Sequence, residues 1–309
     1  MLAFIFPGQG SQAVGMARDL YESSASAKAL LDDLASALDF PLLQLMFEGP
    51  ADALMRTEHA QPALLAHSAA ACLLLNEAGV RPDAVAGHSL GEYSALVAAG
   101  CLSPVDAIRL VGLRGRYMAE AGREVGGTMA AVLGLDAEAL RAAIEPAREV
   151  GVVCLANLNA PGQVVISGEE EAVRRASELA SGAGAKRVLP LSVSGAFHSP
   201  LMAPAAERLS AALSKVALSD AVVPLVSNVD AEPRTSGADI RAALLAQLTG
   251  AVRWDDCVAR LVQLGVTDFI EVGPGKVLTG LLKRAAPEAR ALNADTLDSI
   301  GAAVAALQS

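Results

Sequence analysis

The sequence predicts an α/β protein that consists of a large domain with a parallel sheet and a smaller inserted subdomain. Up to about residue 122, short apolar runs alternate with longer stretches of helical periodicity, which is typical of a parallel sheet covered by helices. This alternation stops at a glycine-rich segment, residues 122–127, and resumes after Pro200. The large domain is therefore predicted to be discontinuous, comprising residues 1–125 and 195–309.

Two short apolar runs, Leu2–Phe6 and residues 84–86, are expected to be the inner strands of the large sheet. The longer periodic stretches are expected to be the covering helices. By the same patterns, the remaining elements are strands over 222–229 and Asp268–Val272 and helices over 110–121, 239–248 and 276–286.

The inserted subdomain, residues 126–194, has a regular order of predicted elements: strand 129–135, helix 137–147, strands 150–155 and 163–167, helix 170–180 and strand 187–193. This βαββαβ order is typical of a ferredoxin-like fold. Asp136 occupies the expected N-cap position of the first helix. The middle strands are joined by a predicted hairpin turn, Asn159-Ala160-Pro161-Gly162.

A pentapeptide that begins directly after the strand at 84–86 has the spacing of a nucleophile elbow, Gly87-His88-Ser89-Leu90-Gly91. Residues of helical composition follow it, so the predicted context is the strand, turn and helix of an α/β-hydrolase-like domain. Small residues on both sides of a serine let the backbone turn tightly and keep the hydroxyl accessible. Ser89 is therefore the candidate nucleophile.

A serine hydroxyl needs a general base, and the chain contains 4 histidines. His88 adjoins Ser89, but neighbouring elbow residues point in different directions, so we expect His88 to support the turn. His59 and His67 are expected to be structural or surface residues. His198 lies in a loop at the predicted junction of the two domains, a position that fits a catalytic base and a polar loop residue equally well.

Composition excludes several classes of function. A chain of 309 residues with 53% hydrophobic content can bury a large core, and its net charge of −10 argues against binding nucleic acid. The N-terminus lacks a basic segment, and the longest apolar helical stretch, 63–75, is too short for a membrane span. We therefore expect a cytoplasmic protein. The four cysteines form no CxxC pair, so neither a disulfide framework nor a metal site is expected.

Four motifs occur in a characteristic order along the chain: Phe6-Pro7-Gly8-Gln9-Gly10-Ser11-Gln12, Gly87-His88-Ser89-Leu90-Gly91-Glu92-Tyr93, Gly195-Ala196-Phe197-His198-Ser199 and Glu271-Val272-Gly273-Pro274-Gly275. Together they resemble the malonyl-CoA:acyl carrier protein transacylases, acyltransferases of fatty acid and polyketide synthesis. The resemblance extends from about Phe4 to the predicted helix near Arg284. Four ordered motifs are far more specific than a single G-x-S-x-G.

This resemblance implies a reaction. A malonyl group would pass from malonyl-CoA to the phosphopantetheine thiol of an acyl carrier protein by a ping-pong mechanism, through an ester on Ser89, to supply fatty acid biosynthesis. His198 would be the general base, oriented by a main-chain carbonyl near Gln247. The N–H groups of Gln9 and Leu90 would form the oxyanion hole, a role that the residue after an elbow serine commonly has. No cofactor is implied, because the coenzyme A thioester is a substrate.

Two further residues would select the substrate. Arg114 would hold the malonyl carboxylate through two parallel hydrogen bonds, although an arginine on a helix is more often part of a surface ion pair. Phe197 would crowd an α-methyl group and so favour malonyl over methylmalonyl, by about 1–3 kcal/mol at most. Of the nearby acids, Glu92 is expected to face the N-terminus of its own helix, and Asp230 is not expected to complete a triad.

The carrier protein in this family's setting is acidic, so docking on an acidic chain calls for a local basic patch. The candidates are Lys186, Arg187, Lys276, Lys283 and Arg284. We assume a monomer. Alternative functions are a discrete acyltransferase of a polyketide synthase and a Ser–His hydrolase or thioesterase, which has no need for Arg114. A third alternative is a carrier-binding module without activity, against which the intact set of site residues argues.

Overall fold

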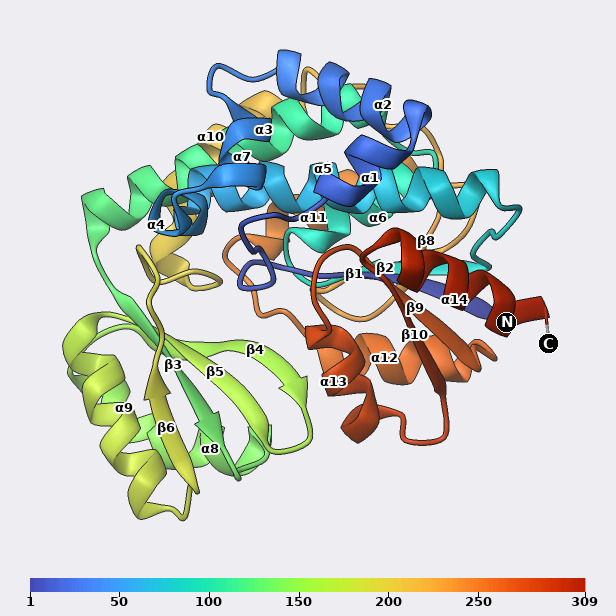
Figure 1. Cartoon of the computed structure of the whole chain (residues 1–309). Coiled ribbons are helices and arrows are strands. Elements are labelled where there is room, and N and C mark those ends of the chain that lie inside the picture. Colours follow the sequence, from blue (N-terminus) through green and yellow to red (C-terminus); the bar gives the residue numbers. More distant parts are fainter. Residues whose placement is uncertain (309) are drawn as a thin grey trace.

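The computed structural model describes residues 1–308, which are organised around two separate β-sheets (Figure 1). The larger sheet has six strands in the order β10-β9-β1-β2-β7-β8. All neighbours in it are parallel except the last pair, β7 and β8. Its strands are β1 (Leu2–Phe6), β2 (Ala84–Gly87), β7 (Leu225–Val226), β8 (Pro233–Arg234), β9 (Asp268–Val272) and β10 (Arg290–Ala294). The prediction that the first two strands lie inside the sheet is confirmed.

Strand β1 is buried on both faces, which explains its uninterrupted apolar sequence. Phe4 and Phe6 belong to the larger apolar cluster, together with residues of the long helices above the sheet. Ala3 and Ile5 point to the opposite face and pack in a smaller cluster that contains Trp254. The core therefore has two layers, one on each side of the large sheet.

Helices cover both faces of this sheet (Figure 1). The lower face in the view carries α12 (Trp254–Gln263) and α13 (Val277–Ala285), whose apolar residues form the smaller cluster. The other helices of the large part are α1 (Arg18–Ser23), α2 (Ala25–Ser36), α3 (Leu42–Glu48), α4 (Ala51–Met55), α5 (Thr57–Glu77), α6 (Gly91–Ala98), α7 (Pro104–Val125), α10 (Ala203–Leu213), α11 (Gly237–Gln247) and α14 (Leu297–Gln308). None of the helices in the described residues is long and apolar enough to cross a membrane.

The smaller sheet is antiparallel, with the order β4-β5-β3-β6. Its elements follow one another as β3 (Thr128–Leu133), α8 (Ala137–Ile144), a 3₁₀ turn (Glu145–Glu149), β4 (Val153–Ala160), β5 (Gln163–Gly168), α9 (Glu170–Gly182) and β6 (Arg187–Pro190). The side chain of Asp136 accepts the N–H of Ala139 at 2.8 Å, so the predicted N-cap is confirmed. An apolar cluster of its own fills the space between this sheet and its two helices.

Several predicted boundaries were wrong for identifiable reasons. The helix predicted over 137–147 ends at Ile144 and passes into the 3₁₀ turn Glu145–Glu149, because Pro146 has no main-chain N–H to continue the α-helical hydrogen bonds. The hairpin turn consists of Pro161 and Gly162 alone, since β4 continues to Ala160, which pairs with Gln163.

Three larger differences concern the edges of the sheets. The strand predicted over 222–229 is only two residues long as β7, because Ser227 leaves the ladder and its carbonyl accepts the N–H of Ala231 in a turn. Strand β6 ends at Pro190, three residues before the predicted end. Strand β10 and helix α14, which complete the large sheet and its cover, were not predicted.

The smaller sheet contacts the large part of the chain at the segment that precedes α12. Asn157 of β4 forms a bridge with Val252, the residue two positions before α12, and the N–H of Leu158 donates to the carbonyl of Val252 at 2.8 Å. At the end of β4, the side chain of Asn159 accepts a hydrogen bond from His88 Nε2 at 2.8 Å. The antiparallel sheet is thereby fixed beside the turn that contains Ser89.

Candidate active site

Ser89 lies on a strained turn between β2 and α6. Its φ of 52° is unusual for a residue other than glycine. The flanking glycines are required sterically, because a Cβ at Gly87 would lie 1.8 Å from the carbonyl carbon of Gly91. A Cβ at Gly91 would lie 2.1 Å from the main-chain oxygen of Phe6. The G-x-S-x-G spacing therefore allows β1, β2 and α6 to approach closely enough to form the turn.

The Oγ of Ser89 lies 2.7 Å from Nε2 of His198. On the other side of the imidazole, Nδ1 lies 2.9 Å from the main-chain oxygen of Gln247. A carbonyl can only accept, so Nδ1 carries the proton and Nε2 is left to accept one from Ser89. Burial, and then the nearby charge of Arg114, lower the pKa of His198 to about 3. The imidazole is therefore neutral near pH 7, as a general base must be.

The loop that carries His198 packs closely on helix α7. A Cβ at Gly122 would lie 2.0 Å from the main-chain oxygen of Ser194, and a Cβ at Gly195 would lie 2.8 Å from Cα of Gly122. The prediction that a glycine-rich break begins at residue 122 was wrong, since α7 continues to Val125. Gly122 is a contact point rather than a turn.

Arg114, on the same helix, is fully buried. Its Nη1 donates to Oε1 of Gln61 at 2.7 Å, and its Nη2 donates to Oε1 of Gln247 and to Oγ of Ser89, both at 3.0 Å. The guanidinium also lies 5.5 Å from the ring centroid of Tyr93. The alternative that Arg114 belongs to a surface ion pair was wrong. Its hydrogen-bond partners are neutral oxygens, and its charge faces the candidate nucleophile.

Asn228, whose side chain forms hydrogen bonds with the main chain of the elbow, was not identified from the sequence. Its Oδ1 accepts the main-chain N–H of Ser89 at 2.8 Å, and its Nδ2 donates to the carbonyl of Gly87 at 2.8 Å. The available signal was its position two residues after the apolar run that ends at Val226, since polar residues at the carboxyl end of a parallel strand commonly form sites.

Glu92 lies in the first turn of α6, as expected, and its carboxylate also has partners outside that helix. Its Oε1 accepts the main-chain N–H of Asn228 at 3.0 Å, and its Oε2 accepts a hydrogen bond from the side-chain amide of Gln247. Both donors come from the segment that runs from β7 to the end of α11, which therefore contacts the first turn of α6. Glu92 is fully buried there.

A pocket of about 120 Å³ opens at Ser89. Gln9, Leu90 and Phe197 are among the residues that line it. The Gln9 loop can approach because residue 8 is glycine, where a Cβ would lie 2.6 Å from the carbonyl oxygen of His88. Within the described chain, the main-chain N–H groups of Gln9 and Leu90 have no hydrogen-bond acceptor. The expected oxyanion-hole donors thus lie at the same pocket as the candidate nucleophile.

Comparison with known proteins adds an independent line of evidence. The acyl transferase domain family matches residues 3–303. The chain belongs to the acyl transferase family. It is 52% identical over 284 residues to the malonyl CoA-acyl carrier protein transacylase of Bacillus subtilis, covering 92% of this chain and 90% of that protein. It is 46% identical over 307 residues to the protein of the same name from Escherichia coli strain K12, covering 99% and 98%.

Solved structures of similar proteins agree with this assignment. An acyl carrier protein S-malonyltransferase from Vibrio cholerae superposes on this acyl transferase with a TM-score of 0.95 at 44% identity, covering 98% of this chain and 99% of the other. A malonyl-transacylase solved in complex with its type II polyketide synthase acyl carrier protein gives a TM-score of 0.95 at 42% identity, with 99% of each chain covered.

The remaining histidines of this acyl transferase make no hydrogen bond to Oγ of Ser89 within the described residues. His88 lines the pocket at Ser89, but its Nε2 donates to Asn159 of the neighbouring sheet and its ring lies tilted, 5.7 Å from the ring of Trp254. His59 Nδ1 donates to the carbonyl of Ala53, and the buried His67 donates to the carbonyl of Asp295, both at 2.8 Å. These contacts are of a structural kind.

The acid considered as a third triad member also has another partner. Asp230 accepts a hydrogen bond from Arg234 at 2.7 Å, which is the main reason why its pKa is lowered. The Nδ1 of His198 is already occupied by the carbonyl of Gln247. Asp230 is therefore part of a local ion pair at the start of β8.

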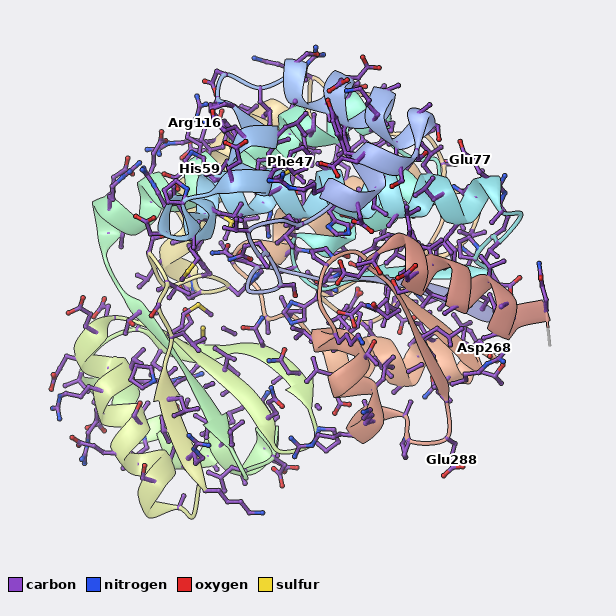
Figure 2. All side chains as sticks on the ribbon, in the orientation of Figure 1. Phe47, His59, Glu77, Arg116, Asp268 and Glu288 are labelled. Atoms are coloured by element: carbon purple, nitrogen blue, oxygen red, sulfur yellow. The ribbon has the colours of Figure 1, made fainter. Side chains whose placement is uncertain are left out.

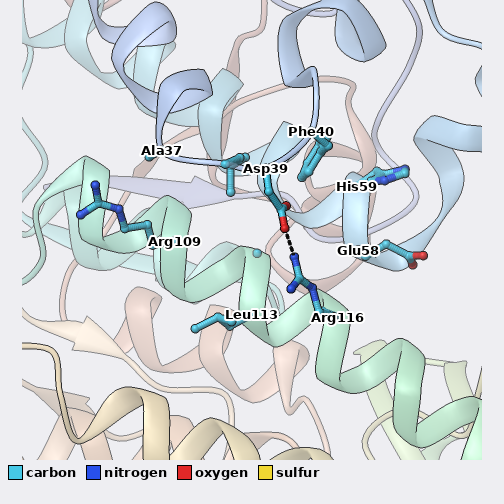
Figure 3. Close-up of a pocket in the computed structure, with 10 residues that line it drawn as sticks. Ala37, Asp39, Phe40, Glu58, His59, Arg109, Leu113 and Arg116 are labelled. Carbon is cyan, nitrogen blue, oxygen red and sulfur yellow. Dashed lines mark hydrogen bonds and ion pairs between the residues drawn. The ribbon is translucent and has the colours of Figure 1, made fainter.

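A larger pocket, of about 550 Å³, lies over the outer side of α7 (Figure 3). Arg109, Leu113 and Arg116 of that helix line it, opposite Phe40 and His59. Figure 2 places His59 and Arg116 near each other on the helical layer far from β10. Apart from His59, this pocket contains none of the residues singled out in the sequence. The candidate catalytic residues line the smaller pocket at Ser89 instead.

Proposed function

We propose that this chain is a malonyl-CoA:acyl carrier protein transacylase that works by a ping-pong mechanism through a malonyl ester of Ser89. The observation that carries the proposal is the double contact of the Ser89 hydroxyl, with Nε2 of His198 at 2.7 Å and Nη2 of Arg114 at 3.0 Å. A general base and a cation suited to a carboxylate thus meet at one nucleophile. The names of the similar proteins support this function.

In the first half-reaction, Oγ of Ser89 attacks the thioester carbonyl of malonyl-CoA while its proton passes to Nε2 of His198. The N–H groups of Gln9 and Leu90 donate to the oxyanion of the tetrahedral intermediate, close to the positive end of the α6 dipole. Collapse of the intermediate breaks the carbon–sulfur bond, and the coenzyme A sulfur takes the proton from His198. One oxyanion donor is worth roughly 10²–10³-fold in rate.

Arg114 selects the malonyl group by its charge. One methylene separates the ester carbonyl from the carboxylate, so in the ester the carboxylate stays beside Ser89 and within reach of the guanidinium. The side-chain oxygens of Gln61 and Gln247 hold the planar fork on two sides, which preorganises it for a bidentate contact. Phe197, which is 5% exposed at the pocket, leaves little space for an α-methyl group.

In the second half-reaction, the phosphopantetheine thiol of the carrier protein gives its proton to His198 and attacks the ester. Ser89 recovers the proton as the ester bond breaks, and malonyl-carrier leaves to supply fatty acid biosynthesis. No cofactor is required, because the thioester is already activated. A cytoplasmic monomer is sufficient for this scheme, since each residue that the steps use comes from one chain.

For carrier docking, the basic candidates that come together are Lys186 and Arg284. A Cβ at Gly134 would lie 2.6 Å from Cγ of Lys186, and a Cβ at Gly162 would lie 3.7 Å from Nη2 of Arg284. Since these two glycines are also joined by a main-chain hydrogen bond of 2.8 Å, both cations lie at one turn. We propose this turn as part of the basic docking patch, together with Arg187, Lys276 and Lys283.

We also propose an assignment of the two structural parts. Residues 1–125 and 195–309 form an α/β-hydrolase-like domain, which the strand, elbow and helix around Ser89 support. Residues 126–194 form a ferredoxin-like subdomain, which the element order and the strand order β4-β5-β3-β6 support.

A two-step transfer assay tests the proposed function. The enzyme is loaded with malonyl-CoA, freed of all coenzyme A by gel filtration, and then mixed with carrier protein bearing phosphopantetheine. Malonyl-carrier formed without added coenzyme A is the expected result. Release of malonate without any malonyl-carrier would overturn the proposal in favour of a Ser–His hydrolase.

A further inference from the structure

A buried carboxylate that the reaction steps do not use lies beneath the elbow. Glu92 is fully buried, and its two oxygens accept from the N–H of Asn228 and from the amide of Gln247. Taking a carboxylate out of water costs several kcal/mol unless donors surround it. Glu92 has such donors, and one of them belongs to the residue that contacts Arg114.

The side-chain amide of Gln247 lies between two opposite charges. Its Nε2 faces Glu92 and also donates to the main-chain oxygen of Ser89 at 2.9 Å. Its Oε1 accepts from Nη2 of Arg114 at 3.0 Å. If the amide rotated by half a turn, its oxygen would face a carboxylate and its NH₂ group would face a guanidinium. The two charges together therefore fix one orientation of the amide.

We propose that Glu92 is a positioning residue for carboxylate selection: by fixing the amide of Gln247, it holds Arg114 in the orientation that receives the malonyl carboxylate. This inference rests on the proposed function and assigns a further residue to the same site. The amide between the two charges is essential to it. A carboxylate bonded directly to Arg114 would compete with the carboxylate of the substrate, whereas an amide oxygen orients the guanidinium without neutralising it.

Glu92 affects the orientation of Arg114, which binds the malonyl carboxylate, and does not affect His198. The main-chain carbonyl of Gln247 accepts from Nδ1 of His198 at 2.9 Å, and this carbonyl stays in place when the side-chain amide turns. Loss of Glu92 should therefore weaken the use of a substrate with a carboxylate more than the use of one without. If Glu92 only stabilised the turn that contains Ser89, its loss would weaken the use of both substrates equally.

The ionised form of Glu92 is the one that accepts from both donors. Burial raises the pKa of Glu92 to about 7, against the opposing effects of the Asn228 N–H, the Gln247 amide and the charge of Arg114. At pH 8 the carboxylate predominates, so the kinetic comparison is made at that pH.

The decisive variant is Glu92→Gln, which preserves shape. In this variant one carboxylate oxygen becomes an NH₂ group, which would face another donor, either the main-chain N–H of Asn228 or the NH₂ group of Gln247. The main-chain N–H of Asn228 is fixed by the backbone, so residue 92 keeps its oxygen there. The Gln247 amide turns instead and presents its own NH₂ group to Arg114. We expect kcat/KM for acylation by malonyl-CoA to fall about 10- to 100-fold, mainly through KM, and that for acetyl-CoA to change less than about threefold.

Glu271→Gln is the matched control. Glu271 is also fully buried, and its carboxylate accepts from the N–H groups of Leu278 and Thr279 at the start of α13. This variant should lower Tm without changing the ratio of malonyl to acetyl acylation. An equal loss for both substrates in Glu92→Gln, or an unchanged ratio, would overturn the proposal.

A second variant keeps the test decisive if Glu92→Gln does not fold. Gln247→Met removes the amide but keeps the main-chain carbonyl that contacts His198. It should show the same selective loss, and adding Glu92→Gln to it should change the ratio no further. Equal losses for both substrates in Gln247→Met would overturn the inference. Wild-type enzyme that malonyl-CoA does not acylate would instead overturn the proposed function.

Discussion

The Nη2 of Arg114 donates a hydrogen bond to Oγ of Ser89 at 3.0 Å. The cation proposed to bind the substrate carboxylate therefore contacts the nucleophile itself in the unloaded enzyme. Burial lowers the pKa of this guanidinium, yet an arginine in a protein stays charged. That charge helps to keep His198 neutral.

Arg114→Ala should impair malonyl transfer much more than acetyl transfer. A buried charged hydrogen bond to substrate is worth about 1.5–3 kcal/mol, so we expect kcat/KM for malonyl-CoA to fall roughly 10- to 100-fold relative to that for acetyl-CoA. The measurement is acylation kinetics with both thioesters. Arg116→Ala is the control, because Arg116 pairs with the exposed Asp39 at 2.8 Å. Equal losses of kcat/KM for both thioesters in Arg114→Ala would contradict the proposal that Arg114 binds the malonyl carboxylate.

The acylation rate should depend little on pH down to about pH 5. Neutral His198 is the active form, so the rate falls only when pH drops through the pKa of the folded enzyme, which is about 3. Acetyl-CoA is the suitable substrate because it reports the Ser–His pair alone. A half-maximal rate near pH 6.5, the ordinary value for histidine, would show that the imidazole is not shielded as the structure implies.

Arg114→Ala supplies a control for the pH dependence of acylation. In Arg114→Ala the pKa of His198 should rise, because the charge of Arg114 is the second cause of its depression after burial. The acidic limb of the rate profile should therefore move to higher pH. An unmoved limb would mean that burial alone determines the pKa.

Asp230→Asn should retain activity within about threefold. The carboxylate pairs with Arg234, and a partly exposed ion pair contributes only about 0–1 kcal/mol to stability. Steady-state transfer to the carrier protein is the measurement. A loss of several orders of magnitude would instead make Asp230 a member of a catalytic triad.

Gly122→Ala should slow acylation by malonyl-CoA and acetyl-CoA to the same extent, by about tenfold or more, and should lower Tm. The added methyl group would push away the carbonyl of Ser194 and with it the loop that holds His198, and small misplacements of catalytic groups cost about 10²-fold. Gly182→Ala is the matched control in α9, where a Cβ meets nothing within 4 Å. Acylation kinetics in Gly122→Ala that match those of Gly182→Ala would contradict this role.

The elbow could be predicted from sequence because its cause is local. The spacing of Gly87 and Gly91 around Ser89, between an apolar strand and a helix, is readable in a short window. His198 could not be distinguished from a polar loop residue by its position, and the family resemblance decided its expected role. The inner position of β1 in the sheet likewise followed from the uninterrupted apolar sequence of Leu2–Phe6.

What could not be predicted depends on contacts between distant segments. Gln61 of α5, Asn228 after β7 and Gln247 of α11 converge on the elbow only in the folded chain. For the same reason the hydrogen-bond partners of Glu92 were not predicted, since they lie more than a hundred residues away in sequence. The short β7 resulted from a turn whose residues serve the site rather than the sheet.

The central claim is a malonyl ester on Ser89, and the intact mass of the protein after brief exposure to malonyl-CoA tests it most directly. The account predicts a malonyl adduct on the wild-type enzyme, a much weaker adduct with acetyl-CoA, and none on Ser89→Ala. An adduct that persists on Ser89→Ala, or release of coenzyme A from the wild type without any adduct, would contradict it.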